Sequence, residues 1–233
     1  MTKFRDKPRL LIFLLCCIAI AASFNTDISS DSLLGMNRSA AGSEYYGCSA
    51  LLTIVSDPGS GESRYGMPCY GHTFLVLENT GEDVLNFCSR EIDAGENLTF
   101  GWWAISSHAG VWFGIESNYI DAYGRYPDRV ALSREIDGEG LSRLEDYILT
   151  HDLYTPIENC AVRAVAAFNW ALPEIRELNC GYFTTPREVS DAIMAHGGSH
   201  EEAMEIDFTV QMPSCNFGED MEFYNFAVKR GAK

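Results

Sequence analysis

Cys160 lies where a turn gives way to a helix, within the stretch YTPIENCAVRAVAAFNWALPE (154–174). The unpaired N–H groups and the dipole at a helix N-terminus lower the pKa of a thiol there. The same N–H groups can hold the oxyanion that forms during acyl transfer. The placement therefore indicates a thiolate nucleophile, although Glu158 opposes it because a nearby carboxylate disfavours a second negative charge.

A thiolate nucleophile needs a base within hydrogen-bond reach, and histidine is the usual one. The chain has five histidines. His72 follows Gly71 in the strand-like segment YGHTFLVLEN (70–79) and is flanked by an apolar run. His72 is therefore the candidate base for Cys160.

The N-terminus has the pattern of an export signal: four basic residues, then the apolar run LLIFLLCCIAIAA, then small residues. We expect a signal peptide over 1–23, a flexible Ser- and Gly-rich leader over 24–47, and a single domain over 48–233. The protein would then be secreted or periplasmic, with no stable membrane span after signal cleavage, since thirteen apolar residues are short for a membrane span. An uncleaved membrane anchor is the alternative.

Signal cleavage would leave six cysteines, and cysteines of exported proteins are usually paired. Cys160 could accordingly be half of a disulfide or a buried inert thiol. If Cys160 is free, at least one of the other five must be unpaired as well. The cysteine count thus favours a competing interpretation without a nucleophile.

The composition narrows the partners and the cofactors. A formal charge of −16 argues against binding nucleic acid or anionic membrane surfaces, which would repel it. HEEAM (200–204) has Met204 where a zinc protease has its second histidine, and Gly197 and Gly198 separate His196 from His200. We therefore expect a polar loop at this place, with no metal and no cofactor.

Strand-like segments precede helix-like segments, which is typical of an α+β fold. The expected strands are 48–55, a hairpin over 70–90, 97–105, 110–116, 129–136, 205–212 and 221–228. The expected helices cover 140–152, the apolar segment that begins at Cys160 and stops before Pro173, and a segment capped by Thr185 with Pro186 and Glu188 after it.

GHTFLVLEN followed by YTPIENCAVRAVAAFNWAL resembles the circularly permuted branch of the papain-like thiol hydrolases, which includes lecithin:retinol-acyltransferase-like proteins. The intervening FGWWAISSHAGVWFGIESNY resembles a bacterial subgroup of that branch. Together the likeness covers 70–172. It implies a permuted papain-like α+β fold, with an antiparallel sheet packed against a buried, cysteine-bearing helix.

The resemblance also implies roles for individual residues. Cys160 matches the nucleophile and His72 the general base. The branch has a third, orienting polar residue, which no position matches outright. Glu116 is the favoured candidate, with Asn86 and His108 as alternatives.

The expected function is that of a secreted cysteine hydrolase that acts on an amide or ester bond through an acyl-enzyme. Its partner would be a peptide, a cell-wall fragment or another acyl substrate. The alternative is a non-catalytic, disulfide-stapled secreted module that binds a partner through the aromatic segment 100–113.

Overall fold

The computed structural model describes residues 45, 47–59, 71–173, 178, 180 and 184–215. The expected signal peptide, most of the leader, Cys69 and the expected strand 221–228 lie outside these residues. Tyr45 is buried and its hydroxyl donates to Glu145. The folded unit therefore reaches back into the segment that we expected to be leader.

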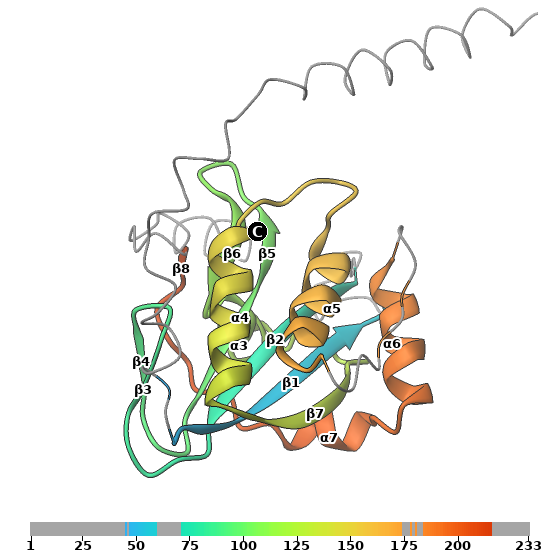
Figure 1. Cartoon of the computed structure of the whole chain (residues 1–233). Coiled ribbons are helices and arrows are strands. Elements are labelled where there is room, and N and C mark those ends of the chain that lie inside the picture. Colours follow the sequence, from blue (N-terminus) through green and yellow to red (C-terminus); the bar gives the residue numbers. More distant parts are fainter. Residues whose placement is uncertain are drawn as a thin grey trace, which may run out of the picture. The chain divides into compact units, whose positions relative to one another are not determined.

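An antiparallel sheet with strand order β7-β1-β2-β5-β6-β8 forms the centre of this unit (Figure 1). Its strands are β1 (Ser49–Asp57), β2 (His72–Asn79), β5 (Asn97–Ala104), β6 (Ala109–Phe113), β7 (Val130–Asp137) and β8 (Ser214–Cys215). A separate ribbon pairs β3 (Leu85–Phe87) with β4 (Arg90–Ile92). The central strands are buried on both faces, as their near-continuous apolar sequences require.

Helices cover both faces of the sheet. The helices are α3 (Ile115–Tyr123), α4 (Gly138–Thr150), α5 (Cys160–Ala171), α6 (Pro186–Ala195) and α7 (His200–Glu205). Side chains of α4, α5 and α6 join Leu75 and Leu77 of β2 in the larger core. Side chains of α3 and α7 join Phe74 and Val76 in a second core. Alternate residues of β2 thus serve opposite layers.

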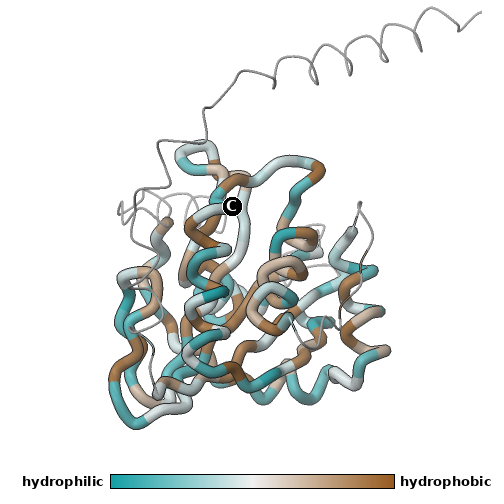
Figure 2. The backbone as a smooth tube through the Cα atoms, in the orientation of Figure 1, coloured by the Kyte–Doolittle hydropathy of each residue, from teal (hydrophilic) through white to brown (hydrophobic). Residues whose placement is uncertain are grey.

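The hydropathy of the backbone follows this layering (Figure 2). Helix α4 alternates along its length between hydrophobic residues, such as Leu141 and Leu144, and hydrophilic residues, and its hydrophobic side faces the core. Helix α5 is apolar nearly throughout and packs against both the sheet and α4. None of the described helices has both the length and the apolarity that a membrane span requires.

The predicted α+β class with an antiparallel sheet is confirmed, as are the helices α4, α5 and α6. The capping box of α6 is present, because the Thr185 hydroxyl accepts from the Glu188 N–H while the Glu188 carboxylate accepts from the Thr185 N–H. Such signals are local, so they can be read from the sequence.

Four expectations for the elements are wrong. The segment 70–90 is not a hairpin, because β2 pairs with β1 and β5 while β3 pairs with β4. Segment 205–212 forms no strand. Helix α3 begins inside the segment expected to be a strand to residue 116, and HEEAM forms the helix α7 instead of a loop. Long-range strand pairing overrode the local pattern at 70–90, and the Ser199 cap started α7. In segment 205–212 the backbone of Asp207 and Thr209 bonds to the Asn97 side chain.

Candidate active site

Cys160 is the first residue of α5 and is buried. Asn159 caps the helix, since its side-chain oxygen accepts from the N–H groups of Ala161 (2.9 Å) and Val162 (3.1 Å). The Asn159 amide donates to the carbonyl of Thr184, which ties the helix start to the approach of α6. These bonds hold the thiol in one place.

Asn159 also restricts the expected oxyanion site. It occupies two of the N–H groups that we expected to serve an oxyanion, and the N–H of Arg163 donates to the Asn159 carbonyl. The N–H of Cys160 itself has no such bond within the described residues. It is therefore the amide at the helix start that remains for a developing oxyanion.

His72 begins β2, which packs against α5, and its imidazole is close enough to the Cys160 thiol for each group to shift the pKa of the other. The imidazole is enclosed by aromatic rings: the centroid of Trp103 lies 4.3 Å from it and that of Tyr126 lies 5.6 Å away. Its Nε2 lies 3.0 Å from Glu116 Oε1, so Nδ1 is the nitrogen left for the thiol.

The charges in the site favour a thiolate and an imidazolium. Burial lowers the pKa of His72, but the negative charges of Cys160 and Glu116 outweigh it and raise the pKa to about 9. Burial raises the pKa of Cys160, but the imidazolium and the N–H groups of Thr73 and Ala161 outweigh it, so the pKa falls below its ordinary value. Glu158 pairs with Arg163 at 2.8 Å, which offsets its expected opposition to the thiolate.

Glu116 lies in the first turn of α3 and is fully buried. Its Oε1 accepts from the indole N–H of Trp103 at 2.7 Å as well as facing His72. Its Oε2 is also buried and has no hydrogen-bond partner within the described part of the chain. A carboxylate held this way orients the imidazole and favours its protonated form.

Gly101 provides the space in which His72 and Glu116 meet. A Cβ at this position would lie 2.4 Å from Glu116 Oε1 and 3.2 Å from His72 Nε2. Any larger residue would have to displace the carboxylate. A glycine inside an otherwise large, apolar strand was the signal for this close approach, and sequence reasoning missed it.

The other two candidates for the third residue lie elsewhere. Asn86 is exposed on β3, in the separate ribbon. His108 lies in the turn between β5 and β6, where its Nε2 is 3.0 Å from Asp152 Oδ1. Among the three, the structure brings only Glu116 to His72.

The features that supported the non-catalytic alternative are weaker in the structure. Cys48, Cys88, Cys160 and Cys180 are free thiols. The aromatic side chains of segment 100–113 are buried, apart from the half-buried Trp103: Phe100, Trp102, Trp112 and Phe113. They form core instead of a binding surface.

His196 and His200 do not converge. His196 Nδ1 bonds to the carbonyl of Ala192, and His200 Nδ1 bonds to the carbonyl of Arg129. Gly197 and Gly198 separate the helices that carry them, as expected. No group of three or more metal-ligating side chains occurs within the described ranges.

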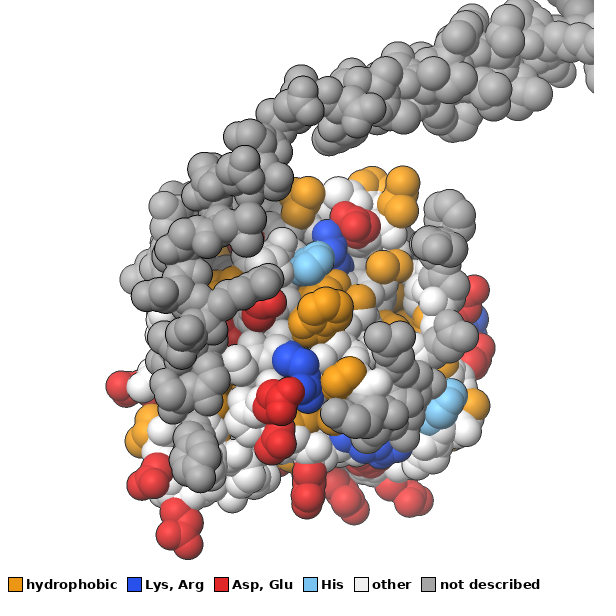
Figure 3. Space-filling model, in the orientation of Figure 1, with side chains coloured by type: hydrophobic (Ala, Val, Ile, Leu, Met, Phe, Trp, Pro, Cys, Tyr) orange, Lys and Arg blue, Asp and Glu red, His pale blue; other side chains and the backbone are white. Residues whose placement is uncertain are grey.

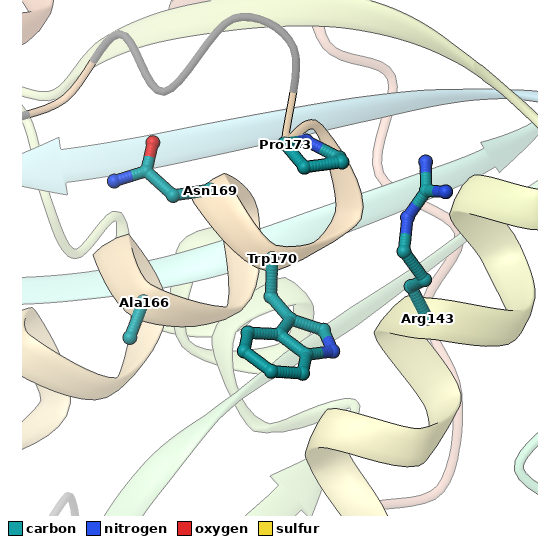
Figure 4. A pocket seen from close by; sticks show the side chains of 5 residues that line it. All are labelled: Arg143, Ala166, Asn169, Trp170 and Pro173. Carbon is teal, nitrogen blue, oxygen red and sulfur yellow. The ribbon is translucent and has the colours of Figure 1, made fainter.

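A hollow of about 440 Å³ lies between α4 and α5, lined by Arg143, Ala166, Asn169, Trp170 and Pro173 (Figure 4). Ten residues of helix separate Trp170 from Cys160, which is roughly 15 Å at ~1.5 Å per residue. The face of the molecule in Figure 3 shows hydrophobic side chains among charged ones. Trp170 is an exposed hydrophobic residue, but the hollow lies away from the thiol.

No protein-family model, no curated protein and no solved structure matches the chain.

Proposed function

We propose that this protein is a cysteine hydrolase in which Cys160 is the nucleophile, His72 the general acid and base, and Glu116 the residue that orients His72. The observation that carries the proposal is a buried group of three side chains: Glu116 hydrogen-bonds to His72, and His72 and Cys160 are close enough for each to shift the pKa of the other. Nucleophile, base and orienting group in hydrogen-bond contact are the arrangement that covalent acyl transfer needs.

The reaction would proceed in two stages. The Cys160 thiolate attacks the carbonyl carbon, and the N–H of Cys160 donates to the oxyanion. The His72 imidazolium then gives its proton to the leaving amine or alcohol as the carbon–nitrogen or carbon–oxygen bond breaks. Neutral His72 next takes a proton from water, the resulting hydroxide attacks the thioester, and the acid product leaves with the thiolate restored.

The resemblance in sequence supports the same chemistry and a permuted papain-like architecture. The order of the residues agrees with it, since the strand with His72 precedes the helix with Cys160. An amide is the preferred bond, because exported proteins of the resembling branch often cut peptides or cell-wall cross-links. The signal-like N-terminus supports secretion.

The test is a screen of the full-length chain against fluorogenic peptide amides and esters, followed by Cys160→Ala on whichever substrate responds. We expect Cys160→Ala to abolish turnover. Cys180→Ala is the matched control, because Cys180 is a partly exposed free thiol whose pKa burial raises, and it should leave turnover unchanged. Equal turnover by the wild type and Cys160→Ala would contradict the proposal.

A further inference from the structure

The turn after α3 has an unusual backbone. Gly124 and Tyr126 both have positive φ, 56° and 58° respectively, with Arg125 between them. A left-handed conformation is uncommon for a bulky residue such as tyrosine and costs of order 1 kcal/mol or more. The carbonyl of Tyr126 accepts from Arg129, which is one of the bonds that hold the turn in this shape.

The turn places Tyr126 beside His72 and Arg125 against the aromatic rings that surround the candidate active site. Tyr126 is buried with its ring 5.6 Å from that of His72. The guanidinium of Arg125 lies 5.5 Å from the ring of Tyr119, and that ring lies 5.6 Å from Trp103, which covers His72. Two aromatic rings, those of Tyr119 and Trp103, therefore lie between Arg125 and the imidazole.

The charges agree with this placement. Burial raises the pKa of Tyr126 well above its ordinary value, and the negative charges of Glu116 and Cys160 raise it further, while Arg125 lowers it. The charges of both the proposed nucleophile and Arg125 thus act on the Tyr126 hydroxyl.

Arg125 stands out among the arginines. Its side chain makes no hydrogen bond and no ion pair with the described residues, and its Nε is buried without a partner, as are those of Arg90, Arg143 and Arg163. The other partly or fully buried arginines in this part of the chain each donate to a carboxylate or a carbonyl: Arg90, Arg129, Arg134, Arg143 and Arg163. What distinguishes Arg125 is that none of its guanidinium nitrogens bonds to a described residue, so its donors are left for a ligand.

We propose that Arg125 binds a carboxylate of the substrate, so that the enzyme acts on amides or esters that carry a free carboxylate near the bond to be cut. This inference rests on the proposed function of Cys160. A planar guanidinium can pair with a carboxylate through two parallel hydrogen bonds, and that of Arg125 lies over the Tyr119 ring. In a protein with a charge of −16, a local cation is what admits an anionic substrate.

The test compares two thiol reagents of equal shape, iodoacetylglycine and iodoacetylglycinamide, on the full-length chain. In each case the Cys160 sulfur bonds to the CH2 carbon and iodide leaves, and the extent is followed by mass spectrometry of the Cys160 peptide. Only the first reagent carries a carboxylate. We expect Arg125→Gln to lower the rate ratio of acid to amide reagent by about tenfold, the scale of a charge-assisted hydrogen bond.

Arg143→Gln is the control. Arg143 lies on α4 and donates to the carbonyl of Ala171, at the opposite end of α5 from Cys160, so removing its charge should leave the ratio unchanged. Arg125→Lys, which keeps the charge without the fork, should give an intermediate ratio. In the wild type, added salt should lower the ratio of acid to amide reagent, because salt screens the attraction between Arg125 and the carboxylate. A ratio that does not change with salt would contradict the proposal even if Arg125→Gln does not fold.

The outcomes separate the two proposals. Ratios for Arg125→Gln and wild type within about twofold of each other, with Cys160 still reactive, would overturn the carboxylate proposal alone. A Cys160 that resists both reagents in the native protein, yet reacts once the chain is unfolded, would overturn the proposed function as well.

Discussion

At the scale of residues, the charges of three ionisable groups in the candidate site stabilise one another. The thiolate raises the pKa of His72, and the imidazolium lowers the pKa of Cys160. Glu116 reinforces the imidazolium from the other side of the ring. The thiolate–imidazolium pair therefore persists over a range of pH. It is lost at low pH, where Cys160 takes up a proton with a pKa below the ordinary thiol value of 9.0. It is lost at high pH, where His72 releases its proton at about 9.

Glu116→Gln tests this coupling. The amide keeps the shape of the carboxylate but removes its charge, so the pKa of His72 should fall and that of Cys160 should rise. We expect kcat/KM to drop by about 100-fold or more, within the range of general acid–base effects. The plateau of the pH–rate profile should narrow from both sides.

The control for this prediction is Glu145→Gln, in a partly buried hydrogen-bond network with Tyr45 and the N–H of Cys88. It should affect stability and leave the shape of the pH profile as it is. An unshifted profile in Glu116→Gln would mean that Glu116 does not act on His72.

Gly101→Ala tests the space between β5 and α3. The added methyl group would meet Glu116 Oε1 and His72 Nε2, so the carboxylate must move away from the ring. We expect a loss of kcat with a smaller effect on KM, and a loss of about 1–3 kcal/mol in the free energy of unfolding, as is usual for overpacking. Steady-state kinetics and urea denaturation measure the two effects. Full activity in this variant would show that the contact is not needed.

At the scale of elements, the caps of α5 and α3 position the chemistry. Asn159 sets the first turn of α5 and therefore the thiol, while Gly114, with φ of 74°, starts α3 so that Glu116 falls in its first turn. A Cβ at Gly114 would also crowd the carbonyl of Gln211 at 3.2 Å. Both helix starts converge on His72 at the beginning of β2.

Asn159→Ala should lower the free energy of unfolding by about 1 kcal/mol, the usual cost of losing an N-cap. It should also lower turnover, because the first turn of α5 is no longer held. Thr185→Ala is the matched control: it removes the cap of α6 at a similar cost in stability, but it should change turnover little. Equal losses of turnover in the two variants would argue that stability, and not the position of Cys160, is being measured.

At the scale of the whole molecule, the fold depends on one sheet buried between helices, and the described thiols Cys48, Cys88, Cys160 and Cys180 are not cross-linked. A chain of this length can bury enough apolar surface to fold without disulfides. The competing disulfide-stapled module would depend on cross-links instead.

A reductant should therefore leave the Tm nearly unchanged. Losing a structural disulfide costs about 2–5 kcal/mol, which would shift the Tm by several degrees. The measurement is thermal unfolding with and without dithiothreitol, together with thiol titration of the denatured chain in the absence of reductant. A large fall in Tm with reductant, or fewer than four titratable thiols, would contradict the structure.

The sequence by itself determined much of the local structure. The strands 49–57, 72–79 and 97–104, the helix that begins at Cys160 and the capped start of α6 follow from apolar runs, N-caps and prolines. These signals act over a few residues, and their free energies do not depend on the rest of the fold. The types and the order of His72 and Cys160 also pointed to thiol chemistry.

Only the tertiary structure decided which side chains meet. In the sequence Glu116 was the favoured partner for His72, with Asn86 and His108 as alternatives. Helix α3, which was not expected, is what aims Glu116 at the ring 44 residues away. The sequence likewise could not show that Gly101 leaves room for that contact, or that Arg125 ends unpaired beside the aromatic rings. Such contacts depend on strand order and on which face of the sheet a residue takes, and both are set by long-range packing.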